Sequence, residues 1–454
     1  MDWIRRHVAL VGTLLSALCL AYFYMLDRAF FSSVGLAPIF AFLLTVLDVN
    51  AAWLGVGICV AACAWRRPAP IIRVVGYLGD HPLATAIAGT ILACTGTILV
   101  YHNHPLSMDE YAAVFQAKVF ASGHVSAQLP VALLDWLVVP GFNGSFLIAS
   151  HATGRAIEGY WPGFALLLAP FVAVGIPWLC NALLAGLSLL LIHRITLQLT
   201  ADRQAAGWAV LFTLASGAFL GNAISYYSMQ AHLTANLLFA WLLLKPSSWR
   251  AAAAGLVGSL ALVLHNPFPH TLFALPWIAS LALDRSRRRL LLPLALGYLP
   301  LTLGLGLGWL LLRANIADVA GSATAVHRIV QGVFVWPNAR LINMRAASVA
   351  KLWVWAVPCL LVFATLGAWR VRANQQARLL VLSAALTFSG YLFVELDQGH
   401  GWGYRYFHSA WGVLPILAAC AITRQESHAP LTCFAGATAI LSVLLLVPLQ
   451  MKQI

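Results

Sequence analysis

The sequence predicts an all-α polytopic membrane protein, and three observations support this fold class. Of the 454 residues, 61% are hydrophobic and 9% are charged, whereas a soluble domain carries about 25% charged residues. The apolar residues form runs near the length of roughly 20 residues that a membrane helix needs. Short basic clusters separate these runs, as is typical of cytoplasmic loops. Soluble enzymes, disordered chains and disulfide scaffolds are therefore excluded.

The apolar runs predict about 13 transmembrane helices. They lie near residues 8–26, 36–64, 83–101, 178–199, 207–226, 229–245, 251–267, 270–283, 290–312, 347–368, 379–396, 409–423 and 431–449.

One apolar segment, residues 161–177, is ambiguous because it contains three prolines. If it crossed the membrane, Arg194 and Arg203 would face outside and every later loop would be inverted. We therefore expect a juxtamembrane helix there that does not cross. With a cytoplasmic N-terminus, most basic clusters then face the cytoplasm. The outer face receives the long loop 102–177 and the loops 313–346 and 397–408.

The net charge of +13 does not indicate a nucleic-acid partner, because no basic stripe with interleaved aromatic residues is present. The eight cysteines lie in apolar segments without metal-binding spacing, which favours packing roles.

The sharpest polar motif is the acid pair Asp109 and Glu110, at the outer end of the third predicted span. Apolar residues recur at helical spacing over 111–123, which predicts an amphipathic helix at the membrane interface. Ser107 precedes Glu110 by three positions, as in a capping box, so a purely structural role stays open. The other interpretation is catalytic, because a carboxylate beside apolar groups can act as a general base.

Arginines on the outer side are candidates for binding a phosphate, since guanidinium groups form paired hydrogen bonds with phosphate. Arg313 and the glycine-rich, aromatic segment 397–408 belong to this set, although such aromatics also form membrane belts. Tyr160, in Tyr160-Trp-Pro-Gly163, is a candidate for the floor of the site. The phosphate- or donor-binding candidates are Arg405, Arg340, Arg345, Lys118, Tyr160 and Tyr404.

Histidines near the outer face raise the alternative of a metal site. His232 and His265 are the candidate ligands, with His270 nearby, but no local metal-binding motif supports them. We expect no cofactor, and a divalent metal stays an open alternative. Asp48 lies within a predicted span, where an acid marks either a polar patch or a proton relay.

The chain resembles the GT-C superfamily of polyprenyl-phosphate-sugar glycosyltransferases at three stretches. The first is the acid pair, aromatic residue and amphipathic helix of 109–123. The second is the aromatic-proline stretch of 160–175, and the third is the span closed by basic residues over 181–203. The resemblance covers roughly residues 105–245 and is strongest to the branch of protein mannosyltransferases and aminoarabinose transferases.

The resemblance implies a helix bundle with an outward-facing active site. The donor would be a polyprenyl-phosphate sugar, Asp109 or Glu110 would be the base, and the anomeric carbon would be inverted. The acceptor would be a lipid, glycan or protein. Three regions follow: 1–80, two additional membrane helices; 81–245, a GT-C-like core; and 246–454, the remaining bundle.

This sequence departs from the family pattern at His232, where an aspartate is common, and in having the additional helices. It also lacks a large soluble C-terminal domain, which disfavours an oligosaccharyltransferase. We expect a bacterial inner membrane protein with a periplasmic active site. The alternatives are a transporter or flippase for lipid-linked sugars, and a polysaccharide polymerase or ligase resting mainly on loops 313–346 and 397–408.

Overall fold

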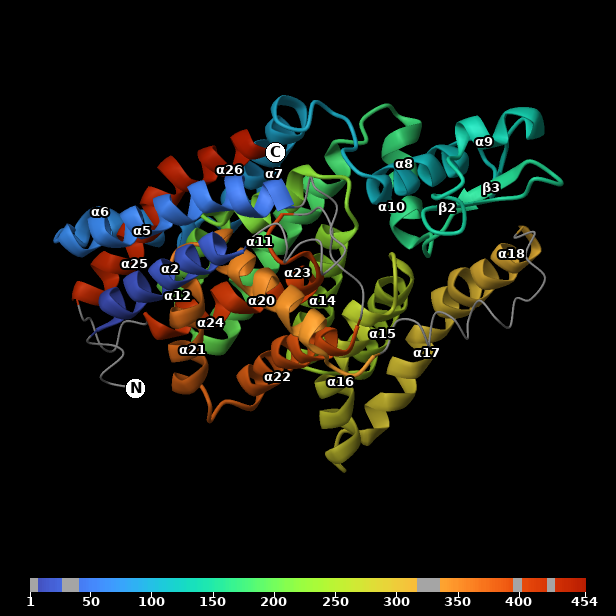
Figure 1. Ribbon diagram of the computed structural model, residues 1–454. Coiled ribbons are helices and arrows are strands. Elements are labelled where there is room, and N and C mark those ends of the chain that lie inside the picture. Colours follow the sequence, from blue (N-terminus) through green and yellow to red (C-terminus); the bar gives the residue numbers. More distant parts are fainter. Residues whose placement is uncertain (1–6, 27–40, 317–334, 395–401, 423–428) are drawn as a thin grey trace. The chain divides into compact units, whose positions relative to one another are not determined.

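The computed structural model describes residues 7–26, 41–316, 335–394, 402–422 and 429–454, and this part of the chain is predominantly helical (Figure 1). Seven of its helices are long and apolar enough to cross a membrane, or eight if one bent pair counts as a span. The predicted class, an all-α polytopic membrane protein, is confirmed. The expected number of about 13 spans stays a prediction.

The chain divides into two compact units. Unit 1 comprises residues 1–91, 186–222 and 336–454, and unit 2 comprises 92–185 and 223–335. The predicted three regions follow the sequence, whereas both units combine segments far apart in the chain.

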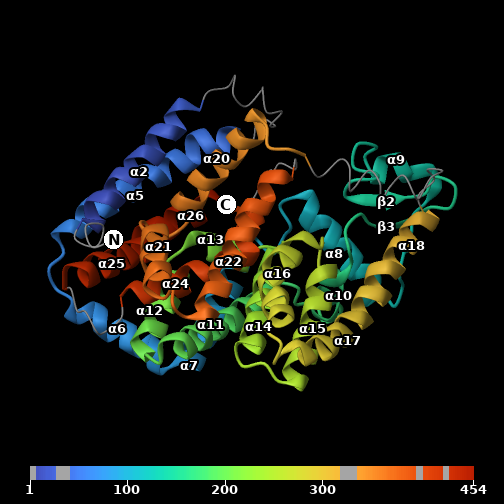
Figure 2. The same cartoon turned by 90° about the horizontal axis from the view of Figure 1, so that it is seen from below.

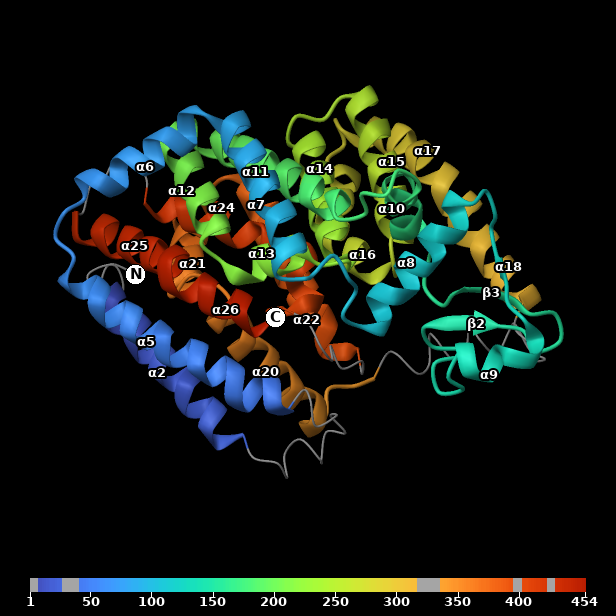
Figure 3. The ribbon, with the colours of Figure 1, turned by 90° about the horizontal axis from the view of Figure 1, so that it is seen from above.

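In unit 1, the first helices pack against a helix from the C-terminal half (Figures 2 and 3). These are α2 (Val8–Met25), α5 (Asp48–Ala64), which continues the π-helical η1 (Leu43–Leu47), and α20 (Ala339–Val354). The contact includes buried charge. Lys351 Nζ lies 3.6 Å from Asp48 Oδ2, and the indole of Trp355 donates to Asp48 Oδ1 at 2.7 Å. Asp48 is therefore part of a polar patch that joins the N-terminal helices to α20.

Unit 1 contains further helices, of which α7, α11 and α13 continue into unit 2. Their bounds are α6 (Ala69–Asp80), α7 (Pro82–Leu99), α11 (Leu179–Thr200), α12 (Arg203–Leu214), α13 (Gly217–Ile224), α21 (Leu360–Arg370), α22 (Gln375–Gly390), α23 (His408–Trp411), α24 (Val413–Ala421), α25 (Ala429–Leu441) and α26 (Val447–Gln453).

Unit 2 contains a helical part and a small sheet that both approach the acid pair. Its helices are α8 (Met108–Ala121), α9 (Leu134–Leu137), α10 (Gly163–Ala173), α14 (Met229–Leu244), α15 (Ser248–Val263), α16 (Phe268–Leu283), α17 (Leu291–Leu301) and α18 (Gly308–Ile316), with η4 (Thr302–Leu307) joining the last two. The antiparallel sheet has the order β1 (Ala127–Gln128), β3 (Arg155–Glu158), β2 (Leu147–Ala149), and Leu147 pairs with Glu158.

The sheet divides its apolar side chains between two faces, as the alternation of a strand requires. Ala156 packs with Leu134 and Val138 of the α9 region. Ile157 packs on the opposite face with Trp309 of α18. The sheet thus connects the loop after α8 to the end of α18.

Glycines bring α15 and α17 into close contact in unit 2. A Cβ atom at Gly255 would lie 2.1 Å from the Leu294 carbonyl oxygen, and one at Gly297 would lie 2.2 Å from that of Ala252. A side chain at either position would push the helices apart. We call Gly255 and Gly297 the glycine seam.

Several predicted spans differ from the observed helices. The single span predicted at 347–368 is wrong, because α20 ends at Val354 and α21 begins at Leu360. Cys359 between them has a left-handed φ of 72°, which a continuous helix cannot contain. The span predicted at 207–226 is bent by 65° between α12 and α13. The apolar segment 161–177 forms α10, whose 11 residues reach about 17 Å and are too short to cross a bilayer.

Candidate active site at the start of helix α8

Helix α8 begins at the predicted acid pair, and its two carboxyl groups lie in different surroundings. Asp109 is partly exposed and Glu110 is buried. Ser107 occupies the N-cap position but makes no side-chain bond to the helix backbone. Its hydroxyl lies 3.2 Å from Glu110 Oε2 instead. The predicted capping pair therefore forms in altered geometry.

Glu110 is held by backbone groups from two segments. Its Oε2 accepts a hydrogen bond from the Leu106 amide at 2.9 Å, and its Oε1 accepts one from the Tyr226 amide at 2.8 Å. Burial raises the pKa of the Glu110 carboxyl to about 7, although these hydrogen bonds oppose the shift. Glu110 thus fastens the start of α8 to the turn before α14.

Asp109 instead meets an aromatic side chain from the segment before α10. The Tyr160 hydroxyl donates a hydrogen bond to Asp109 Oδ1. The Tyr160 ring also packs against a histidine, because the centroids of the Tyr160 and His265 rings lie 3.9 Å apart. A partly exposed carboxylate fixed by a phenol can accept a proton from a bound hydroxyl group.

The end of the long helix α17–α18 fixes the backbone of the Tyr160 segment. The Trp309 indole donates to the Tyr160 carbonyl at 2.7 Å, and Arg313 Nη1 donates to the Gly159 carbonyl at 2.8 Å. Trp309 and Arg313 are one helical turn apart, so their side chains can donate to the successive carbonyls of Tyr160 and Gly159. We call these two contacts the carbonyl clasp. Arg313 thereby places a positive charge in the same unit as the acid pair.

A second buried acid, Glu158, lies two residues before Tyr160. Burial raises the pKa of the Glu158 carboxyl well above its usual range. Its Oε1 has no hydrogen-bond partner among the residues that the structure describes. The Glu158 amide donates to Gln116 Oε1 at 3.1 Å, which ties β3 to α8. Neither Glu158 nor Gln116 was among the predicted site residues. What distinguishes them is their burial in the folded chain, and the sequence pattern does not reveal this burial.

Three of the predicted phosphate-binding arginines, Arg340, Arg345 and Arg405, lie in unit 1. Arg345 is buried and donates to the carbonyls of Tyr391 at 2.9 Å and Val394 at 2.6 Å. Arg405 is also buried, and both guanidinium groups lie over the Tyr406 ring, at 5.6 Å and 5.7 Å from its centroid. These contacts hold the segment 402–407 against α20.

The remaining unit 1 candidates differ in exposure. Arg340 is exposed, whereas Tyr404 is buried with a hydroxyl that has no hydrogen-bond partner among the described residues. Parts of the predicted loops, residues 317–334 and 395–401, lie outside the described residues.

In unit 2, Lys118 is exposed on α8. His232 is fully buried, and His265 is the residue that stacks on Tyr160. Within the described residues, no group of three or more histidine, cysteine, aspartate or glutamate side chains is arranged to hold a metal ion.

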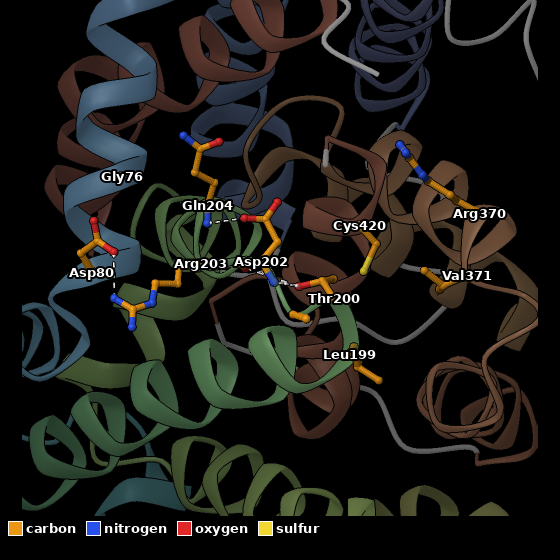
Figure 4. A pocket seen from close by; sticks show the side chains of 11 residues that line it. Gly76, Asp80, Leu199, Thr200, Asp202, Arg203, Gln204, Arg370, Val371 and Cys420 are labelled. Carbon is orange, nitrogen blue, oxygen red and sulfur yellow. Dashed lines mark hydrogen bonds and ion pairs between the residues drawn. The ribbon is translucent and has the colours of Figure 1, made fainter. Parts of the chain in front are cut away.

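A cavity of about 680 Å³ lies elsewhere, within unit 1 (Figure 4). Asp80 and Arg203 form an ion pair at 3.3 Å on its wall, and Arg370 lies across from them (Figure 4). Its lining contains none of the predicted site residues. These side chains belong to the basic loops that we expect at the cytoplasmic face, so we do not assign the cavity to the candidate active site.

The fold defines the class of the protein, an all-α polytopic membrane protein. The chain is similar to the crystal structure of ArnT from Cupriavidus metallidurans bound to undecaprenyl phosphate, with a TM-score of 0.50 and 15% sequence identity. The match covers 75% of this chain and 60% of that one. No family model and no curated protein sequence matches this chain. At this identity the likeness shows the fold, which confirms the predicted GT-C architecture.

Proposed function

We propose that this protein is a membrane glycosyltransferase that moves a sugar from a polyprenyl phosphate to an acceptor hydroxyl. The observation that carries the proposal is the partly exposed Asp109, held by Tyr160 at the start of α8, in a chain with the GT-C fold. The undecaprenyl phosphate bound to the structurally similar ArnT supports a polyprenyl donor. The active site would face the periplasm of a bacterial inner membrane.

In this mechanism, Asp109 is the general base. It takes the proton of the acceptor hydroxyl as the hydroxyl oxygen attacks the anomeric carbon. The bond from that carbon to the phosphate oxygen breaks, and the polyprenyl phosphate leaves with the electron pair. Attack opposite the leaving group inverts the anomeric carbon.

The neighbours of Asp109 position it for this step. Tyr160 fixes the carboxylate through its hydroxyl, and the carbonyl clasp fixes Tyr160. Glu110 is a positioning residue, because both of its oxygens accept hydrogen bonds from the backbone. Arg313 supplies positive charge in this unit, and such charge stabilises a leaving phosphate. Phosphate binding by Arg405, Arg340 and Arg345 of unit 1 stays a prediction.

The test is an assay of the purified protein with radiolabelled polyprenyl-phosphate sugars and a panel of acceptors, with and without a chelator. Transfer by the wild type and its loss in Asp109→Asn would support the proposal. Transfer by Asp109→Asn at the wild-type rate would refute the assignment of the base. If Arg405→Ala abolishes transfer and Asp109→Asn does not, the polymerase or ligase alternative is favoured.

A further inference from the structure

Two buried histidines of unit 2 use their ring nitrogens differently. His270 in α16 has Nδ1 at 2.7 Å from Asn236 Oδ1 and Nε2 at 2.7 Å from the Tyr298 hydroxyl. His232 in α14 is 0% exposed, and neither of its ring nitrogens has a hydrogen-bond partner among the described residues. An unpaired buried polar group is costly, so these two ring nitrogens of His232 call for an explanation.

Ser228 shares this property at the same end of α14. It occupies the N-cap position, and its carbonyl accepts the His232 amide at 3.0 Å. The Ser228 hydroxyl is buried and has no hydrogen-bond partner within the described residues. Two unpartnered side chains therefore lie one helical turn apart, and both can donate and accept hydrogen bonds.

The turn that carries Ser228 is fixed from several sides. The Asn181 side-chain amide donates to the carbonyls of Ser225 at 2.7 Å and Tyr227 at 2.9 Å. Glu110 accepts the Tyr226 amide at 2.8 Å. The turn is therefore held in place before any ligand arrives, and such preorganisation lowers the entropic cost of binding.

The residues around His232 and Ser228 include groups that are linked to the acid pair. His265 lies close enough to His232 to interact with it electrostatically. His265 stacks on Tyr160, and Tyr160 donates to Asp109. The turn that carries Ser228 is also bonded directly to the acid pair, through the Tyr226 amide and Glu110.

We propose that His232 and Ser228 form the subsite that binds hydroxyl groups of the donor sugar, an inference that rests on the proposed transferase function. A neutral imidazole donates through one nitrogen and accepts through the other, which matches a sugar hydroxyl. No carboxylate among the described residues is hydrogen-bonded to either side chain, so the subsite suits a neutral sugar rather than a cationic amino sugar. A metal ion fits less well, because the described residues offer no set of three ligands.

The test is a kinetic cycle that combines variants with deoxy donors. The full-length protein is given a polyprenyl-phosphate hexose and its monodeoxy analogues. In the wild type, removal of the recognised hydroxyl raises KM on the order of 10- to 100-fold. His232→Phe raises KM for the intact donor by a similar factor. In this variant, KM does not rise further when the donor lacks that hydroxyl. Inhibition by sugar-free polyprenyl phosphate is unchanged, because that lipid does not reach the subsite.

His270→Phe is the matched control, since it removes a buried histidine whose nitrogens are both bonded within the protein. This variant is less stable to heat but discriminates among the deoxy donors as the wild type does. If His232→Phe does not fold, His232→Gln and Ser228→Ala provide the same comparison.

Three outcomes would overturn the inference. Variants at His232 and Ser228 that retain wild-type discrimination among deoxy donors refute the subsite while leaving the transferase intact. Preference for a 4-amino-4-deoxy sugar donor over the neutral hexose refutes the proposed sugar class. A wild type that neither binds nor turns over any lipid-linked sugar refutes the transferase, and the subsite fails with it.

Discussion

Glu110 in unit 2 and Asp48 in unit 1 are both buried acids, but their partners differ. Glu110 is held by neutral donors, the amides of Leu106 and Tyr226. Asp48 meets the Lys351 ammonium at 3.6 Å and the Trp355 indole. An acid held by neutral donors can change its charge within a folded protein, whereas a buried ion pair depends on both charges. Both acids join segments of the chain, but only Glu110 is held in a way that lets its charge change with pH.

The largest expected effect concerns the acid next to Glu110. Asp109→Asn removes the proposed base and should lower kcat by about 10²- to 10⁴-fold, without lowering the unfolding temperature. Transfer assays and thermal unfolding in the same detergent measure both effects. Loss of folding in this variant would instead place Asp109 with the structural acids.

The second expected effect concerns the ion pair of unit 1. Asp48→Ala or Lys351→Met alone leaves an uncompensated buried charge, and each should cost about 3–5 kcal/mol of unfolding free energy. The double variant Asp48→Leu with Lys351→Met should be closer to the wild type, because no unpaired charge remains. Additive losses in the double variant would show that the two charges do not act as a pair.

The third prediction concerns the pH dependence of Glu110. Its folded pKa of about 7 lies above the ordinary glutamate value of 4.5, so its contribution to stability is complete below pH 4.5 and is lost as the pH rises through 7. The loss is roughly 3 kcal/mol at most. Glu110→Gln cannot ionise, so this part of the pH dependence should disappear. Unfolding measured between pH 4.5 and 8.5 tests it, and an unchanged slope in the variant contradicts it.

The smallest expected effect concerns Tyr160. Tyr160→Phe keeps the ring that stacks on His265 but removes the hydrogen bond to Asp109. We expect a loss of about 1 kcal/mol in transition-state stabilisation, or roughly fivefold in kcat/KM. Tyr160→Phe activity equal to the wild type would show that the carbonyl clasp alone positions the segment.

The sequence was informative where a local pattern determines the outcome. The α8 helix follows from its helical spacing. The prolines of 161–177 and the charges of the later loops led us to expect a juxtamembrane helix there, and α10 is a short helix of 11 residues. The acid pair also appeared as a candidate, but the division between a partly exposed Asp109 and a buried Glu110 depends on Tyr226, more than a hundred residues away. Tertiary contacts of this kind leave no local signal.

Other features were missed for identifiable physical reasons. The strands of the small sheet have two to four residues, which is too short for a readable alternation. The break between α20 and α21 lies at Pro358 and Cys359, inside an apolar run that length alone predicts to be continuous. The guanidinium of Arg345 donates to two backbone carbonyls, contacts that the sequence does not indicate, while its predicted phosphate binding stays a prediction.

The glycine seam has a mechanical consequence for the candidate active site. Gly297 and Trp309 lie on one helical run that extends from Arg288 to Ile316, and 12 residues of helix correspond to about 18 Å. The glycine seam fixes the position of this helical run along α15. It therefore also fixes where Trp309 and Arg313 meet the carbonyls of Tyr160 and Gly159. A single methyl group added at the seam would therefore misalign a carboxylate that it never touches.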